Sequence, residues 1–163
     1  MTPTAYLNSP LGLVSLTGTE AGLSAVSFHH PEGLAATPFS AVPACLQEGH
    51  RQLHAYFARE LRAFSLAYAP AAGTDFQRQV WQALAGIGYG RTASYLDVAR
   101  RLNNPKSVRA VGAANGQNPL AIVWPCHRVI GADGSLTGYA GGLARKKWLL
   151  EFEQPTHQSR LFG

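Results

Sequence analysis

The chain has 163 residues, of which 46% are hydrophobic and 14% are charged, and its formal net charge at pH 7 is +5. This size suits one compact domain or two small ones. The composition excludes several classes of protein. No apolar run approaches the roughly 20 residues of a membrane span, the N-terminus lacks the pattern of a signal peptide, and two cysteines cannot form a disulfide framework. We therefore expect a soluble, cytoplasmic protein.

The N-terminal third predicts strands. Three short runs with partial alternation, at residues 4–10, 11–18 and 22–30, are separated by Ser-Pro and Thr-Glu-Ala-Gly turn signals and indicate an antiparallel meander. Residues 31–44 are rich in Pro, Ala and Gly, which predicts an exposed connection. Residues 44–60 have helical spacing of apolar side chains, and residues 62–70 are consistent with one more strand. The segment 69–74 is the best candidate for a domain boundary.

After this boundary the apolar spacing becomes helical. Residues 74–87 predict a helix with Thr74 or Asp75 as its N-cap, and two shorter helices are expected at 94–102 and 106–115. A buried strand or turn at 120–131 follows, then a glycine-rich loop and a last helix at 145–153. The predicted fold class is α+β: a small N-terminal antiparallel-sheet domain, residues 1–70, precedes a mostly helical C-terminal domain, residues 74–155.

Positive charge is concentrated in the second half of the chain. Residues 76–150 contain ten Lys and Arg against two acidic residues, a net +8, whereas residues 1–75 contain three Arg against five acidic residues, a net −2. A polyanion such as DNA would therefore meet the C-terminal half first. A basic solvated surface explains the charge equally well, and the run 145–147 is expected to be such a surface.

The helices at 94–102 and 106–115 fit a helix-turn-helix. The second helix is rich in Ala and Gly, which allows its backbone to approach either a DNA groove or another helix. Packing in a core is thus the alternative to DNA binding. Lys106 and Arg109 stand on a helix that is otherwise uncharged, inside the basic segment. Because so few side chains could read bases, we expect DNA binding without sequence specificity.

The segment "VWPCHRVIG", residues 123–131, contains one of the two cysteines. Most cysteines are small buried hydrophobic residues, and that interpretation would make Cys126 inert. Its neighbours favour a reactive thiol instead. Pro125 fixes the backbone before it, His127 is a base that titrates near neutral pH, and Arg128 is a positive charge able to favour thiolate. A Cys–His pair can serve acyl transfer, redox sensing or alkyl transfer.

The motifs "RAVGAANGQNP", "PCHRVIG" and "GYAGGLARKKWLLEFE" together resemble the O6-alkylguanine-DNA alkyltransferase family. The resemblance covers residues 74–153 and, more loosely, the N-terminal strands. It implies direct reversal of DNA damage: the cysteine takes the alkyl group from O6-alkylguanine, and in some cases from O4-alkylthymine, and keeps it. Each molecule would act once, because a thioether has no easy hydrolysis.

The resemblance implies catalytic roles for five residues. Cys126 is similar to the nucleophile and alkyl acceptor, His127 to its base acting through a water, and Glu153 to the carboxylate that orients the histidine. Asn118 resembles the hinge residue before the cysteine. Tyr95 resembles the hydroxyl that supports the base as it leaves.

The resemblance also implies how the damaged base is held. Arg109 resembles the finger that fills the stack when the nucleotide is flipped out. The main-chain groups of Val129 and Ala140 resemble those that read the guanine edge, and Tyr139 resembles a wall of the pocket. Some family members have serine where Ala140 stands. On the second predicted helix, the residues expected to contact DNA together with Arg109 are Lys106, Ala110 and Ala113.

Neither a metal nor a cofactor is expected. His29 and His30 lie near Cys45 in sequence, but adjacent histidines on a strand point to opposite faces. Zinc-containing members of the family use N-terminal ligands that this chain does not match. The expected partner is double-stranded DNA containing alkylated bases, bound by a monomer that could cluster on DNA. The alternative function is a DNA-lesion-binding or alkylation-sensing protein that does not transfer the group, and a cysteine hydrolase is a weaker third hypothesis.

Overall fold

The computed structural model describes residues 2–154, and the chain forms two compact units. Unit 1 contains Met1–Gly73 and Pro119–Val123; unit 2 contains Thr74–Asn118 and Trp124–Gly163. The predicted domain end at residue 155 lies outside the described residues. Within these residues no helix is long and apolar enough to cross a membrane.

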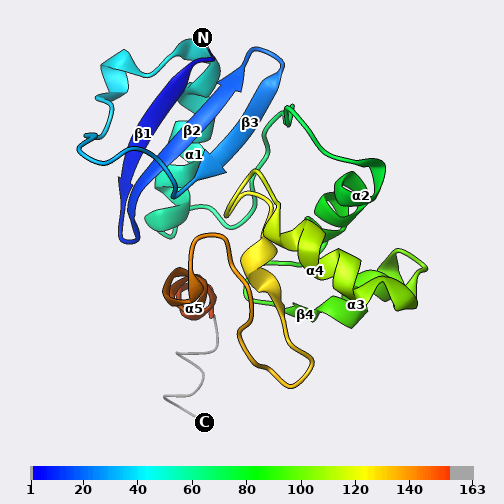
Figure 1. Ribbon diagram of the computed structural model, residues 1–163. Helices are drawn as coiled ribbons and strands as arrows, with labels where there is room; N and C mark the ends of the chain where they lie inside the picture. Colours follow the sequence, from blue (N-terminus) through cyan, green and yellow to red (C-terminus); the bar gives the residue numbers. More distant parts are fainter. Residues whose placement is uncertain (1, 155–163) are drawn as a thin grey trace. The chain divides into compact units, whose positions relative to one another are not determined.

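Unit 1 is built on the expected meander. Strands β1 (Thr4–Ser9), β2 (Gly12–Thr19) and β3 (Gly22–Ser27) form an antiparallel sheet in the order β1-β2-β3. Their alternating side chains supply a buried face that includes Leu7, Val14 and Leu16. Helix α1 (Gln47–Phe57) runs across one face of this sheet (Figure 1) and buries Leu53 and Tyr56 completely. The connection before it contains two short 3-10 turns, η1 (Phe39–Ala41) and η2 (Ala44–Leu46).

The expected strand at 62–70 is wrong. Only one isolated bridge forms, between Tyr68 and Leu23, with hydrogen bonds from Leu23 N to Ala67 O and from Ala69 N to Leu23 O. Two segments pair with the outer edge of β3. The segment at Tyr68 bonds Leu23, whereas the segment 119–121 bonds Val26. Since two different segments divide this edge and Pro70 has no N–H, neither segment extends into a ladder.

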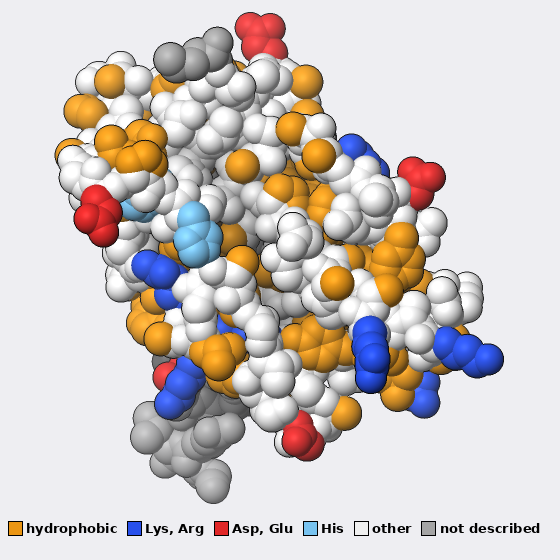
Figure 2. Space-filling model, viewed as in Figure 1, with side chains coloured by type: hydrophobic (Ala, Val, Ile, Leu, Met, Phe, Trp, Pro, Cys, Tyr) orange, Lys and Arg blue, Asp and Glu red, His pale blue; other side chains and the backbone are white. Residues whose placement is uncertain are grey.

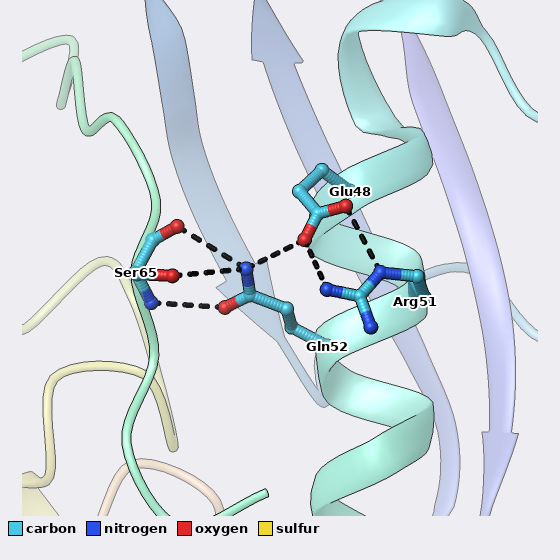
Figure 3. A network of polar contacts seen from close by, with 4 residues as sticks. All are labelled: Glu48, Arg51, Gln52 and Ser65. Carbon is cyan, nitrogen blue, oxygen red and sulfur yellow. Dashed lines mark hydrogen bonds and ion pairs between the residues drawn. The ribbon is translucent and has the colours of Figure 1, made fainter.

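A polar network on unit 1 joins α1 to the segment after it (Figure 3). The Gln52 side chain is 2% exposed; its Nε2 donates to Ser65 O at 3.1 Å and its Oε1 accepts from Ser65 N at 2.9 Å. Gln52 Nε2 also donates to Glu48, which pairs with Arg51 at the surface. The buried amide thereby satisfies the backbone of a segment that has no strand partner.

Unit 2 is mostly helical, as predicted. It contains α2 (Asp75–Leu84), α3 (Tyr95–Arg101), the 3-10 turn η3 (Pro105–Ser107), α4 (Val108–Gly116), the 3-10 turn η4 (Cys126–Arg128) and α5 (Leu143–Phe152). Both α2 and α3 begin with capping boxes, Thr74 with Gln77 and Ser94 with Asp97. The last helix begins two residues earlier than expected, after Gly142 with φ 93°.

Two very short strands of unit 2 were not expected. β4 (Ala93–Ser94) pairs in parallel with β5 (Val129–Ile130). They hold the start of α3 beside the chain that leaves η4. The core of the unit includes Trp81, whose Nε1 donates to Ala114 O at 2.9 Å, and Trp124, whose ring stacks on Trp81 with centroids 5.8 Å apart.

Candidate active site

Cys126 lies in the apolar core of unit 2. The residue is 4% exposed and belongs to the same cluster as Val80, Trp81 and Val129. Pro125 precedes a tight turn in which Cys126 N donates to Trp124 O at 2.7 Å and Arg128 N donates to Pro125 O at 2.9 Å. This turn, η4, directs the thiol inward, so the sulfur can be reached only by a group that enters the core.

Burial raises the pKa of the Cys126 thiol to about 11. Several groups oppose this shift: a hydrogen bond from the Asn118 side chain, the positive charge of Lys146, and the main-chain N–H groups of Cys126 and His127. At pH 7 a pKa near 11 leaves roughly one thiolate in ten thousand molecules. The thiol proton must therefore be removed as the sulfur reacts, by a base held beside it.

His127 is completely buried, and its Nε2 lies 2.8 Å from Glu153 Oε2. Burial lowers the pKa of this imidazole in spite of the carboxylate, so the ring is neutral at pH 7. An ionised carboxylate can only accept hydrogen bonds, so Nε2 must carry the ring proton. The lone pair is then on Nδ1, which is buried and has no hydrogen-bond partner among residues 2–154. Nδ1 is the basic atom of the site.

Arg128 and His127 both bond the Glu153 carboxylate. Arg128 Nε donates to Oε1 at 2.7 Å and Nη2 donates to Oε2 at 3.0 Å, while Nη1 donates to Ile87 O at 2.7 Å. Burial acts to raise the pKa of the Glu153 carboxyl, but the hydrogen bonds and charges of His127 and Arg128 prevail and lower it to about 2. The carboxylate is thus ionised at pH 7 and fixes the proton on His127 Nε2.

A second polar group joins α3, the loop 131–142 and α5. Lys146 is 0% exposed, its Nζ donates to Thr137 O at 2.7 Å, and it lies 5.9 Å from the centroid of the Tyr95 ring. Tyr95 OH donates to the same Thr137 carbonyl at 3.0 Å and accepts from Thr137 Oγ1 at 3.2 Å. The Tyr95 hydroxyl proton is therefore engaged with the loop.

The two asparagines of α4 and its C-terminal end hold the backbone around the cysteine. Asn118 Nδ2 donates to Trp124 O at 2.8 Å, and Asn115 Nδ2 donates to Cys126 O at 3.2 Å. Asn115 is 3% exposed and its Oδ1 has no partner among the described residues. Sequence reasoning had singled out Asn118 and missed Asn115.

The expected substrate-binding residues lie in different surroundings. Val129 is fully buried in β5, whereas Ala140 is exposed. The Tyr139 hydroxyl is buried without a partner in residues 2–154, and burial raises its pKa well above 10, with a further contribution from Cys126. Tyr139 is thus electrostatically coupled to the sulfur and packs against its cluster.

The expected DNA-binding residues share the exposed side of α4 and the turn before it. Lys106, Arg109, Ala110 and Ala113 are all exposed, whereas Val111, Ala114 and Asn115 face the core. One side of this helix therefore offers small side chains and one arginine to solvent. On the face drawn in Figure 2, Lys and Arg side chains stand apart with uncharged groups between them.

The structure also corrects two expectations about charge. Arg128 does not act on the thiol through its own charge; its guanidinium is engaged with Glu153 and Ile87 O. The run 145–147 is not a uniform solvated surface, because Lys146 is buried beside the site while Lys147 is exposed. The spacing of Lys146, Leu149 and Glu153, at i, i+3 and i+7 on α5, was the available signal that these three share a buried face. No group of three or more His, Cys, Asp or Glu among residues 2–154 could hold a metal ion.

Comparison with known proteins identifies the family of the chain. Residues 75–155 match the family model described as 6-O-methylguanine DNA methyltransferase, DNA binding domain. A methylated-DNA–protein-cysteine methyltransferase of Methanosarcina acetivorans is 49% identical over 151 residues, covering 91% of this chain and 96% of the relative. The chain belongs to the methylated-DNA–protein-cysteine methyltransferase family. A Mycobacterium tuberculosis member is 45% identical over 152 residues, covering 91% of this chain and 90% of the relative.

Solved structures of the family confirm the expected fold class. The crystal structure of Mycobacterium tuberculosis O6-methylguanine methyltransferase matches with a TM-score of 0.81 and 42% identity, covering 100% of both chains. The structure of Mycobacterium tuberculosis OGT in complex with DNA matches with a TM-score of 0.80 and 44% identity, covering 93% of this chain and 92% of that one. The α+β arrangement of a small antiparallel sheet followed by helices is that of these methyltransferases.

Proposed function

We propose that this chain repairs duplex DNA by moving the alkyl group of O6-alkylguanine, and also of O4-alkylthymine, to Cys126, once per molecule. It would act as a cytoplasmic monomer, without a cofactor, on a nucleotide flipped out of the helix. The observation that carries the proposal is a buried thiol whose next residue is a buried, neutral imidazole, with Nδ1 as the nitrogen that lacks a partner in residues 2–154. Membership of the methyltransferase family supports the same conclusion.

The reaction balances within the groups of the site. The Cys126 proton passes to His127 Nδ1 through a water, and the sulfur attacks the alkyl carbon. The S–C bond forms as the C–O6 bond breaks, its electron pair stays on the guanine, and the proton finally reaches guanine N1. A thioether remains on the protein and guanine on the DNA. Glu153, ionised at all physiological pH values, stabilises the imidazolium while it exists.

Other residues would receive and position the base. We assign Tyr95 to the leaving base, which requires its hydroxyl to release Thr137 O, since that carbonyl now accepts its proton. Lys146 would retain the carbonyl when this happens. Val129, Tyr139 and Ala140 would line the pocket, and Asn118 would fix the turn before the cysteine.

DNA contact is assigned to the helix-turn-helix formed by α3 and α4. The exposed small residues Ala110 and Ala113 would let α4 approach the minor groove closely, and Lys106 would contact phosphate. Arg109 would fill the gap left by the flipped nucleotide and offset part of the unstacking cost, which is on the order of a few kcal/mol. The degenerate base pattern of the minor groove suits a protein that must examine every sequence.

The decisive experiment is mass spectrometry after mixing the protein with duplex DNA that contains one O6-methylguanine. The peptide holding Cys126 should gain about 14 Da, with one methyl group per protein molecule. The Cys126→Ala variant should bind the same DNA and leave the lesion in place. An unshifted peptide, or protection of cells by the Cys126→Ala variant, would instead favour a lesion-binding sensor.

A variant of the proposed finger tests base flipping separately. Arg109→Ala should slow repair of duplex DNA by roughly tenfold or more while the reaction with free O6-methylguanine base keeps its rate, because only the duplex requires extrusion. Lys147→Ala, at another exposed cation, is the matched control. An equal loss on both substrates would contradict the role of the finger.

A further inference from the structure

A hollow of about 430 Å³ lies on unit 2 between the end of α2, the loop that follows and α3. It contains none of the residues assigned above to catalysis, substrate or DNA. Arg91, Arg100 and Arg101 line it, together with Thr92 and the main chain of Gly86 and Gly88. We call these three side chains and the hollow they line the arginine hollow.

The arginine hollow carries a net positive charge. Its lining holds three guanidinium groups and one carboxylate, Asp97. That carboxylate is committed to the start of α3: its Oδ2 accepts from Ser94 N at 2.8 Å, and this contact is the main cause of its lowered pKa. The three arginines are exposed, and none of their side chains forms a hydrogen bond or ion pair with another residue between 2 and 154.

The backbone brings these cations close to the main chain of the loop. The Arg101 guanidinium lies against the main chain at Gly86: a Cβ there would be 2.9 Å from Arg101 Nη2 and 3.0 Å from its Cζ, so a side chain at this position would shift the guanidinium. Arg91 N donates to Gly88 O at 3.0 Å in the turn before β4. Ile87 also lines the hollow, and its carbonyl accepts a hydrogen bond from Arg128 Nη1. The loop at Ile87 is therefore tied to the buried Arg128–Glu153 pair.

A structural role accounts for part of this arrangement but not for all of it. Arg100 and Arg101 stand in the last turn of α3, where cations interact favourably with the helix dipole. Arg91 belongs to the loop between α2 and β4, not to a helix, and adds a third like charge to the same hollow. Like charges repel, and a bound anion with several acceptor oxygens would relieve this repulsion.

We propose that the arginine hollow binds a phosphate group, held by the guanidinium forks of Arg91, Arg100 and Arg101 and by the Thr92 hydroxyl. Phosphate is the anion whose oxygens match several forks at once. The backbone of duplex DNA is the source if the proposed function holds, and this part of the inference rests on it. The residues that would bind this phosphate belong to neither η3 nor α4.

The test compares two triple variants of the full chain. Arg91→Ala/Arg100→Ala/Arg101→Ala removes the arginine hollow. Arg51→Ala/Arg62→Ala/Lys147→Ala removes the same charge from exposed positions outside it. Binding to undamaged duplex DNA is measured at several salt concentrations. The hollow variant should lose about 0.9 from the slope of log affinity against log salt for each phosphate contact removed, which is about a threefold change in affinity over a fourfold range of salt.

Two further measurements separate the possible sources of phosphate. Inorganic pyrophosphate should raise the melting temperature of the control variant but not of the hollow variant if free phosphate binds. A smaller salt slope in the hollow variant identifies DNA as the source, and a lost pyrophosphate effect alone identifies free phosphate. If both variants behave alike in both measurements, the inference is overturned. Methyl transfer to Cys126 from free base is followed alongside, so failure of the proposed function is seen independently.

Discussion

A Glu–Arg pair bound to a third polar side chain occurs in each unit, and the two networks differ in burial. In unit 1, Glu48 bonds Arg51 and Gln52, and both charged side chains are more than half exposed. In unit 2, Glu153 bonds Arg128 and His127, and the carboxylate side chain is 1% exposed. Both carboxyl groups have a pKa lowered to about 2. The two carboxyl groups therefore reach the same pKa in different ways: hydrogen bonds dominate at Glu48, whereas at Glu153 the partners must overcome a large effect of burial.

The exposed pair and the buried pair differ in how much they contribute to stability. The pKa of Glu48 is lowered by hydrogen bonds from Arg51 and Gln52, with little desolvation to overcome. Because water competes for an exposed pair, such a pair adds little stability. At Glu153 the attraction of His127 and Arg128 must exceed the cost of burying the carboxylate. Removal of either partner leaves a buried charge that is less well compensated. In unit 2 the buried ion pair fixes the tautomer of His127, whereas in unit 1 the exposed Glu48–Arg51 pair contributes little and the buried Gln52 amide holds the segment at Ser65.

The largest effect is expected from the buried arginine. Arg128→Met removes the guanidinium that pairs with the buried Glu153 carboxylate and should lower the free energy of unfolding by about 3–5 kcal/mol. Urea denaturation followed by tryptophan fluorescence measures this. A loss below about 1 kcal/mol would show that the carboxylate finds water or takes up a proton, which contradicts its description as tightly paired.

The next effect concerns acid and the rate of alkyl transfer. The folded pKa of Glu153, about 2, lies below its ordinary value of 4.5, so the ionised form adds stability above pH 4.5 that is lost as the pH falls toward 2. Glu153→Gln should flatten this part of the stability curve. It should also slow methylation of Cys126 by roughly 10- to 100-fold, because the proton on His127 is no longer fixed by a charge. An unchanged methylation rate would show that His127 is not the base that removes the Cys126 proton.

A smaller loss is expected at the buried amide of unit 1. Gln52→Ala removes the partners of Ser65 N and O and should lower the free energy of unfolding by about 1–3 kcal/mol. Methylation of Cys126 should keep its rate, since this residue lies in the other unit. Urea denaturation and a methylation time course check both statements. Gln52→Glu should destabilise at least as much, because it places a second carboxylate beside Glu48 and against the Ser65 carbonyl at a buried position.

The smallest effect is expected at the exposed arginine. Arg51→Met is the matched substitution to Arg128→Met, and it should leave the urea midpoint unchanged within error, because the Glu48 carboxylate remains solvated. A destabilisation comparable to that of Arg128→Met would show that burial does not govern these two networks.

The sequence predicted the elements that have a clear periodicity or a cap. Alternation located β1 to β3, and Thr74 predicted the start of α2 correctly. The predictions failed where a segment's structure depends on which strand it can pair with. Residues 62–70 have the composition of a strand, but only Tyr68 bridges to β3, because another segment pairs with the rest of that edge. Strands β4 and β5 are each two residues long, which is too short to show any periodicity.

The site was predictable in its residue types and less so in its connections. The motif at 125–128 pointed to the thiol and its adjacent base. The partner of the His127 ring, a carboxylate 26 positions later in the chain, could be predicted only from the family resemblance, because the local sequence pattern carries no sign of it. Lys146 was hidden inside a run of basic residues whose other members are at least partly exposed. A charge count treats all three alike, and only the helical phase of α5 separates them.

The path of the chain between Asn118 and Trp124 limits how this protein could be divided. The chain passes into unit 1 for residues 119–123, and the Asn118 side chain bonds Trp124 O where it returns. A single scission after Gly73 would therefore leave Leu120 and Ile122, both buried, on a fragment without β3. For a split reporter or a minimal enzyme, the apparent linker is a poor place to cut, because the C-terminal fragment would expose apolar side chains that unit 1 buries.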